Sequence, residues 1–119
     1  MNAVFFPFLI ALAAPAPAAT ADPEARRYAL VVGANDGGPG RARLRYATDD
    51  ARRVAQVLIE LGGVRAGDEV LLLEPRRGDL ERAFDELDRR LGARAGATRR
   101  QEVVVYFSGH SDETGLLLG

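Results

Sequence analysis

The sequence predicts an α/β fold built on a parallel sheet with helices on both faces. Three short apolar runs, at residues 28–32, 69–74 and 102–107, show no alternation of polar and apolar residues, which is typical of strands buried on both faces. Between them lie two segments with apolar residues three and four positions apart, as expected for helices. Right-handed crossovers in the order strand, helix, strand, helix, strand make all three strands parallel.

The first 21 residues are predicted to be a secretory signal peptide. Residues 3–14 are apolar, prolines and small residues follow, and Ala19-Thr20-Ala21 fits an Ala-x-Ala cleavage site. The apolar stretch is shorter than the roughly 20 residues that a membrane-spanning helix needs. Because no Lys or Arg precedes it, a disordered leader and a start codon assigned too far upstream stay open as alternatives. Cleavage predicts a secreted or periplasmic protein, without membrane contact, whose domain is residues 22–119.

The composition excludes several kinds of partner and site. The chain carries 16 basic and 17 acidic residues, a formal net charge of −1, which gives no electrostatic case for binding nucleic acid. It contains no cysteine, so no disulfide, zinc–thiolate site or cysteine nucleophile can form from these 119 residues. We expect neither a metal ion nor a cofactor.

The first apolar run leads through a glycine-rich loop into the first helix. Residues 47–61 carry apolar side chains at helical spacing, and Thr48 is the expected N-cap. Asp49 and Asp50 suit the positive end of the helix dipole. Gly62-Gly63 supply the left-handed conformation that ends many helices, so the helix is expected to stop there.

The second helix follows the second apolar run. Gly78-Asp79 opens it, with Asp79 as the expected cap, and Gly92 ends it. Its apolar stripe consists of Leu80, Phe84, Leu87 and Leu91. After the third strand, the apolar residues 115–119 predict a short fourth strand.

Two polar loops, residues 33–45 and 108–114, leave the carboxyl ends of predicted strands. In parallel sheets these ends meet at one edge, where ligands bind, so we expect the two loops to lie together. The first loop is rich in glycine, but Pro39 interrupts the Gly-x-Gly-x-x-Gly spacing of a dinucleotide site, and a P-loop needs a lysine that the chain lacks. A small nucleotide-binding domain stays a weaker alternative.

His110, the only histidine, is the best candidate for chemistry in the second loop. It follows a buried strand, and Gly109 before it allows a sharp turn and the close approach of a substrate. Imidazole is the most common general acid and base in enzymes. From the residues alone, a structural or merely exposed histidine remains the alternative.

The segment YFSGHSDETGLLLG, residues 106–119, resembles the histidine segment of caspase-like cysteine peptidases, which include caspases, metacaspases and bacterial relatives. YALVVGAND, residues 28–36, is similar to the family's first strand and Gly-x-Asn turn. LRYATDDARRVAQVL, residues 44–58, is similar to its first helix, with an Asp-Ala step at Asp50-Ala51. The resemblance implies the N-terminal part of a three-layer caspase-like α/β fold with a mostly parallel, incomplete sheet.

The resemblance also implies a cysteine-type endopeptidase that acts on protein or peptide substrates with a Cys–His dyad. His110 corresponds to the catalytic histidine, which helps to deprotonate the thiol and protonates the leaving amine. The backbone N–H of Ser111, where the family usually has glycine, corresponds to a donor of the oxyanion hole. Leu44 stands where caspases carry the arginine that binds aspartate substrates, so a preference for Arg or Lys is expected. Arg43 and Arg45 beside it are expected to be solvated.

The nucleophile of that family is absent from this sequence. Ser108 and Ser111 are poor substitutes, because neither lies in the Gly-x-Ser-x-Gly turn that exposes a nucleophilic serine. Two hypotheses remain. The first is the front part of a secreted peptidase, cut short at Gly119 and inactive by itself; the open apolar edge that its sheet would leave favours this hypothesis. The second is a non-catalytic interaction or regulatory module that pairs this edge with another chain.

Overall fold

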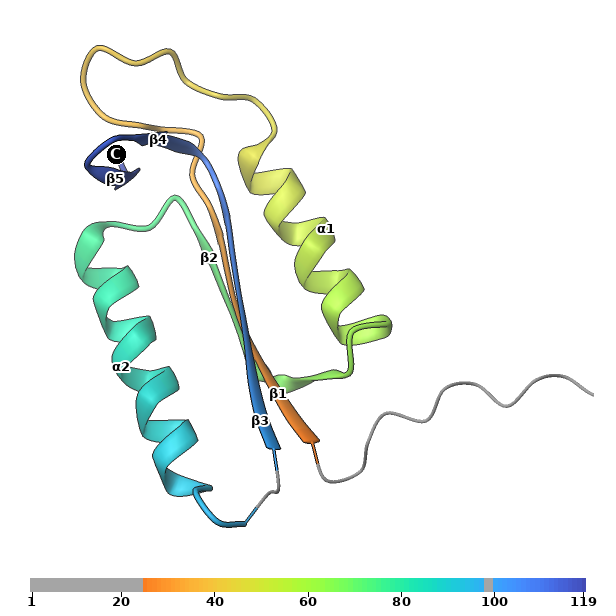
Figure 1. Ribbon diagram of the computed structural model, residues 1–119. Helices are drawn as coiled ribbons and strands as arrows, with labels where there is room; N and C mark the ends of the chain where they lie inside the picture. The colour runs from red at the N-terminus through yellow and green to blue at the C-terminus, as the bar shows by residue number, and fades with distance from the viewer. Residues whose placement is uncertain (1–24, 98–99) are drawn as a thin grey trace, which may run out of the picture.

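The computed structural model describes residues 25–97 and 100–119, in which a sheet lies between two helices (Figure 1). The elements follow the predicted order, and a small hairpin is added after the third strand. They are β1 (Ala25–Gly33), α1 (Ala47–Glu60), β2 (Val64–Leu73), α2 (Arg77–Ala93), β3 (Arg100–Ser108), β4 (His110–Asp112) and β5 (Gly115–Leu117). The predicted signal peptide lies outside the described residues.

β1 is the central strand of a parallel sheet with the order β2-β1-β3. Gly33 at the end of β1 pairs with Leu73 on one side and with Ser108 on the other, so the three strands end at one edge. The parallel arrangement predicted from the apolar runs is confirmed. The strands begin earlier than those runs, because polar residues continue the ladder: residues 25–27 pair with residues 100–102.

α1 and α2 cover opposite faces of the sheet (Figure 1). Successive residues of β1 alternate between the two faces: Ala29 and Val31 pack against α1, whereas Leu30 and Val32 pack against α2. All four are at most 1 % exposed, which confirms a strand buried on both sides. Neither helix within residues 25–97 and 100–119 is long and apolar enough to cross a membrane.

α1 approaches the sheet closely because the residues at the contact are small. Its buried residues are Ala47, Ala51 and Ala55. A Cβ atom on Gly33 would lie 2.7 Å from both the carbonyl oxygen of Ala47 and the Cβ of Ala51, closer than packed atoms can come. Glycine at the end of β1 therefore lets the first turn of α1 lie against the strand.

The predicted N-caps of the two helices, Thr48 and Asp79, are wrong by two and three residues, because the caps are Tyr46 and Arg76. α1 begins at Ala47, before Thr48, and its first backbone N–H donates to Asn35 Oδ1 at 2.9 Å. α2 begins at Arg77, and Asp79 lies in its first turn, where its carboxylate accepts from the Arg76 backbone N–H at 2.9 Å. In both cases the acceptor is a side chain that satisfies a free N–H, as a cap does, but from another position.

The predicted stop of α1 is confirmed, and that of α2 is nearly correct. α1 ends at Glu60, and Gly63 has the left-handed φ of 72° that was expected there. α2 runs one residue past Gly92, to Ala93.

The predicted fourth strand exists, but it does not join the parallel sheet. β5 pairs with β4 in an antiparallel hairpin, with His110 opposite Leu117 and Asp112 opposite Gly115. The chain therefore folds back on itself directly after β3. Among the described residues, the outer edge of β3 has no strand beside it, and the side chains of Val103 and Val105 are 41 % and 52 % exposed.

Candidate functional site

The two polar loops meet at the carboxyl edge of the sheet, as the parallel strands predict. The backbone N–H of Ala34, directly after β1, donates to the carbonyl oxygen of Ser108 at 2.9 Å. The loop over residues 34–46 then extends toward the β4–β5 hairpin (Figure 1). This contact brings the first loop beside His110, the first residue of β4.

His110 is half-buried, and its ring is oriented by the first loop. Its Nε2 lies 2.8 Å from the carbonyl oxygen of Ala42. Because a carbonyl can only accept a hydrogen bond, Nε2 must carry the proton and donate it. In the neutral ring, Nδ1 is then the nitrogen with a free lone pair. The geometry thus selects one tautomer and assigns the basic position to Nδ1.

Gly37 allows the first loop to lie against the imidazole. A Cβ atom at Gly37 would stand 2.4 Å from His110 Cδ2 and 2.6 Å from Cγ, so no other residue fits without displacing the ring. Gly109 is equally confined, because its Cβ would lie 2.6 Å from Phe107 Cζ and 3.0 Å from the Ala34 carbonyl oxygen. Gly37 therefore allows the loop to lie against the imidazole, and Gly109 allows the chain to pass close to Phe107 and Ala34.

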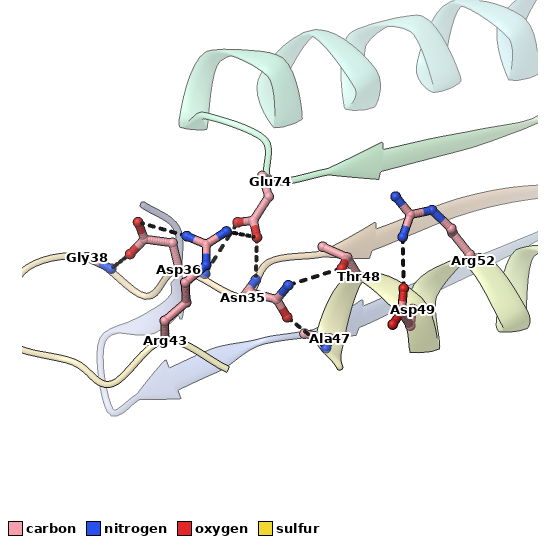
Figure 2. A network of polar contacts seen from close by, with 9 residues as sticks. All are labelled: Asn35, Asp36, Gly38, Arg43, Ala47, Thr48, Asp49, Arg52 and Glu74. Atoms are coloured by element: carbon pink, nitrogen blue, oxygen red, sulfur yellow. Dashed lines mark hydrogen bonds and ion pairs between the residues drawn. The ribbon is translucent and has the colours of Figure 1, made fainter. Parts of the chain in front are cut away.

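Glu74, at the end of β2, holds the first loop in place (Figure 2). Its carboxylate accepts hydrogen bonds from the backbone N–H groups of Asn35 at 3.1 Å and Asp36 at 3.3 Å, and it forms an ion pair with Arg43 at 2.8 Å. Arg43 adjoins Ala42, so the carboxylate binds both ends of the loop segment that supports His110. Glu74 itself has a left-handed φ of 50°, unusual for a residue other than glycine.

Asn35 connects this network to α1 (Figure 2). Its side-chain oxygen accepts from the Ala47 backbone N–H at 2.9 Å, and its side-chain nitrogen donates to the Thr48 hydroxyl at 3.1 Å. Its own carbonyl oxygen accepts from the Leu44 backbone N–H at 2.8 Å. One residue thereby fixes the start of the loop, its end and the start of the helix.

An ion pair also joins the first loop to the β4–β5 hairpin. Arg41 donates to the Asp112 carboxylate at 3.1 Å. Hydrogen bonds from the Thr114 hydroxyl and backbone N–H, together with the Arg41 charge, lower the pKa of Asp112. Asp112 is thus held in its charged form, which keeps the hairpin attached to the loop.

The other predicted site residues lie in β4 and in the first loop. Ser111 follows it in β4, opposite Leu116, and its side chain is exposed. Leu44 and Arg45 lie in the exposed part of the first loop. Arg43, expected to be merely solvated, is exposed but bound to Glu74 and Asp36, because two carboxylates lie within 4 Å of it.

Sequence reasoning missed Ala42 and Glu74. Ala42 acts through its backbone carbonyl, for which its side chain gives no signal. Glu74 could have been found, since it is a charged residue directly after a buried strand, at the edge where the loops were expected to meet. Within the described ranges, no three acidic, histidine or cysteine side chains gather as a metal ion would require.

A comparison with protein families decides which fold family this arrangement represents. The family model described as caspase domain, of the C14 peptidases, matches residues 26–117, from the second residue of β1 to the last residue of β5. The chain belongs to the caspase domain family. The α/β order, the parallel sheet and the two covering helices are those expected for the N-terminal part of the caspase-like fold. No curated protein and no solved structure matched the chain significantly.

The three segments that resemble caspase-like peptidases come together in the structure. His110, the Gly-x-Asn turn and the first helix all lie inside the matched residues. In the structure these three segments meet, since Asn35 of the turn contacts the start of α1 and the following loop contacts His110. Segments that are far apart in the sequence thus form one site.

Proposed function

We propose that this chain provides the histidine side of a cysteine-type endopeptidase, with His110 as the base and acid of a Cys–His dyad. The hydrogen bond from His110 Nε2 to the Ala42 carbonyl supports this most directly, because it leaves Nδ1 free to accept a proton. Membership in the caspase domain family supports protein or peptide substrates.

In this mechanism, Nδ1 of His110 accepts the proton of a cysteine thiol, and the thiolate attacks the carbonyl carbon of the scissile peptide bond. His110 then returns the proton to the leaving amine. The Ala42 carbonyl stabilises the imidazolium form because it keeps its hydrogen bond with Nε2–H throughout. The backbone N–H of Ser111 is proposed to donate to the oxyanion.

The thiol must come from outside these 119 residues, which contain no cysteine. The free outer edge of β3 suggests where the cysteine that carries this thiol would lie. A strand that paired in parallel with β3 would end at the same edge of the sheet as β1, β2 and β3, beside His110. A cysteine directly after such a strand would lie close to Nδ1.

We also propose a basic P1 residue and a secreted or periplasmic location. Leu44 replaces the arginine with which caspases bind aspartate, and Arg43 is engaged by Glu74 and Asp36. The apolar leader with its Ala-x-Ala site supports export.

A peptide-cleavage assay tests the dyad. The product of the complete gene is offered fluorogenic peptides that end in Arg, Lys or Asp. His110→Ala is expected to lower kcat/KM by about 10²- to 10⁴-fold, because the proton transfer loses its base. Arg53→Ala, an exposed substitution on α1, is the control and should leave the rate unchanged. Full activity of His110→Ala would reject the proposal.

A non-catalytic interaction module is the second candidate, and the exposed Val103 and Val105 on the free edge of β3 favour it. The nucleotide sequence after the Gly119 codon separates the two. A reading frame that continues into an apolar strand followed by a cysteine supports the peptidase. A stop codon at this place in independent isolates supports the module.

A further inference from the structure

Two contacts join the same two segments of the chain beside the candidate active site. The first is the hydrogen bond from His110 Nε2 to the Ala42 carbonyl oxygen, at 2.8 Å. The second is the ion pair between Arg41 and Asp112, at 3.1 Å. Arg41 directly precedes Ala42 in the first loop. Asp112 follows His110 by two residues in β4, and side chains two positions apart on a strand point to the same face, so both contacts connect one stretch of loop to one face of the strand.

The Asp112 carboxylate is held in place by its own hairpin. Its Oδ1 accepts hydrogen bonds from the Thr114 backbone N–H at 2.9 Å and from the Thr114 hydroxyl at 2.5 Å, which leaves Oδ2 for Arg41. A surface ion pair contributes little when two mobile side chains must both be ordered to form it. Here one partner is already ordered, and the side chains of Arg41 and Asp112 are only 38 % and 28 % exposed. This pair is therefore better placed to hold the loop than an ordinary surface pair.

The Ala42 carbonyl lies between two arginines that are bound in different directions. Arg41, before it, is bound to Asp112 of β4, and Arg43, after it, is bound to Glu74 directly after β2. The carbonyl that orients the imidazole is thus anchored on both sides. Loss of the pair between Arg41 and Asp112 would release the side that faces the hairpin.

We propose that Arg41 and Asp112 are positioning residues of the Cys–His dyad, because their ion pair keeps the Ala42 carbonyl on Nε2 of His110. The catalytic meaning of this inference rests on the proposed function, whereas the positioning is a property of these 119 residues alone. Without the pair, the carbonyl can move away, and the hydrogen of the neutral ring is free to shift to Nδ1. In that tautomer Nδ1 carries a hydrogen and cannot accept the proton of a thiol.

Nitrogen NMR of the neutral His110 ring, in alkaline solution of the 119-residue chain, tests the positioning. Asp112→Asn keeps an oxygen for the bonds from Thr114 but loses the charge that faces Arg41. We expect the ratio of the Nε2–H to the Nδ1–H tautomer to fall roughly two- to tenfold, the range that one hydrogen bond contributes. Arg41→Gln should cause the same fall, whereas Arg41→Lys, which keeps the charge, should retain most of the parent ratio.

A double variant shows whether the two residues act through one contact. Arg41→Gln combined with Asp112→Asn should lower the tautomer ratio no further than either change alone, because only one ion pair can be lost. Arg82→Gln, which breaks an exposed ion pair with Asp79 on α2, is the matched control and should leave the ratio unchanged. The parent ratio in both single variants, additive effects in the double variant, or an equal fall in the control would each overturn the proposal.

Peptide cleavage by the product of the complete gene gives the second measurement. Arg41→Gln should lower kcat roughly two- to tenfold with little change in KM, because a ring in the wrong tautomer is inactive without weakening substrate binding. An unchanged kcat would reject the catalytic role of the pair. Full activity of His110→Ala would instead reject the proposed function, while the tautomer ratio of the 119-residue chain would still decide whether the pair positions the ring.

Discussion

At the scale of single residues, His110 is oriented mainly by residues from a distant part of the sequence. Its ring nitrogen binds the Ala42 carbonyl, and its face lies against Gly37, both in the loop that follows β1. The hairpin β4–β5 carries the ring on its first residue. Substitutions in the first loop should therefore change the orientation of the imidazole.

Gly37→Ala is the most direct test of this contact. The added methyl would lie 2.4 Å from His110 Cδ2, so the ring must move, at a cost in the free energy of unfolding of about 1–3 kcal/mol. Nitrogen NMR of the ring should show loss of the Nε2–H tautomer, and since His110 is the only histidine, the signal needs no assignment. Gly92→Ala, with open space around it, is the control; an unchanged ring spectrum in Gly37→Ala would contradict the packing.

Glu74→Gln should weaken the attachment of the first loop, although Glu74 has no hydrogen bond with His110. Glutamine keeps the shape but loses the ion pair with Arg43 and one of the two oxygen acceptors for Asn35 and Asp36. We expect the free energy of unfolding to fall by about 1–2 kcal/mol in urea titrations. Glu81→Gln, which breaks an exposed pair with Arg77, should cost less than about 0.5 kcal/mol. Equal losses would show that Glu74 is an ordinary surface acid.

Glu69 predicts a particular dependence of stability on pH. Burial raises the pKa of its carboxyl group above the ordinary value of 4.5, and its Oε2 has no hydrogen-bond partner. The folded state therefore holds the proton more tightly than the unfolded state, so the contribution of this group to stability is full below 4.5 and is lost as the pH rises through the folded pKa. Glu69→Gln should remove this loss. Urea titrations of both proteins at acidic and neutral pH measure it, and parallel pH profiles would argue against it.

At the scale of elements, the contact between α1 and β1 sets the shape of the site. The start of α1 lies against Gly33, so Asn35, two residues later, can reach both Ala47 and Thr48. The loop between them is long, yet its two ends are joined. The position of the helix thus determines the path of the loop that reaches His110.

Gly33→Ala should disturb this contact. Its Cβ would lie 2.7 Å from the Ala47 carbonyl oxygen and the Ala51 Cβ, so α1 must shift. We expect a loss of about 1–3 kcal/mol, which lowers Tm by roughly 4–8 °C per kcal/mol in a domain of this size. Gly78→Ala, whose nearest neighbour is the Arg82 side chain at 3.4 Å, should leave Tm unchanged or raise it, because alanine favours the helix. A Gly33→Ala melt equal to that of the parent would refute the close packing.

The elements also show what could be predicted from the sequence. The apolar runs located the buried middle of each strand, and the helical spacing located both helices, because burial determines these patterns. The helix starts were missed, because the group that binds the first N–H of α1 is Asn35, twelve residues away. His110 was found because its side chain is distinctive. The carbonyl that orients it was not, since every residue has one and only the folded loop selects Ala42.

At the scale of the whole molecule, the edge strand β3 exposes apolar side chains. Val103 and Val105 are half-exposed, and no charged side chain interrupts residues 103–107. Natural edge strands usually carry charges or prolines that prevent further pairing. We therefore expect the isolated chain to associate through this strand.

Val105→Lys should reduce that association by placing a charge on the edge. Light scattering over a concentration series should show large species for the parent and a marked shift toward the monomer for the variant. Val57→Lys is the control, because Val57 is equally exposed, at 50 %, but lies on α1. A similar shift in both variants would attribute the effect to net charge. A parent protein that stays monomeric at all concentrations would contradict the expected association.

The central position of β1 also determines when the chain can complete its sheet. Arg27 and Glu102, which pair across β1 and β3, are 75 residues apart, whereas Ala29 and Glu69 of the β1–β2 pair are much closer in sequence. On the ribosome, β1, α1 and β2 can therefore assemble first. The 35 residues from Leu73 to Ser108 then take roughly 2–7 seconds to synthesise at about 5–20 residues per second. During that time the backbone groups of β1 that later pair with β3 have no partner. A chaperone that binds extended apolar segments would bind β1 most readily in this interval.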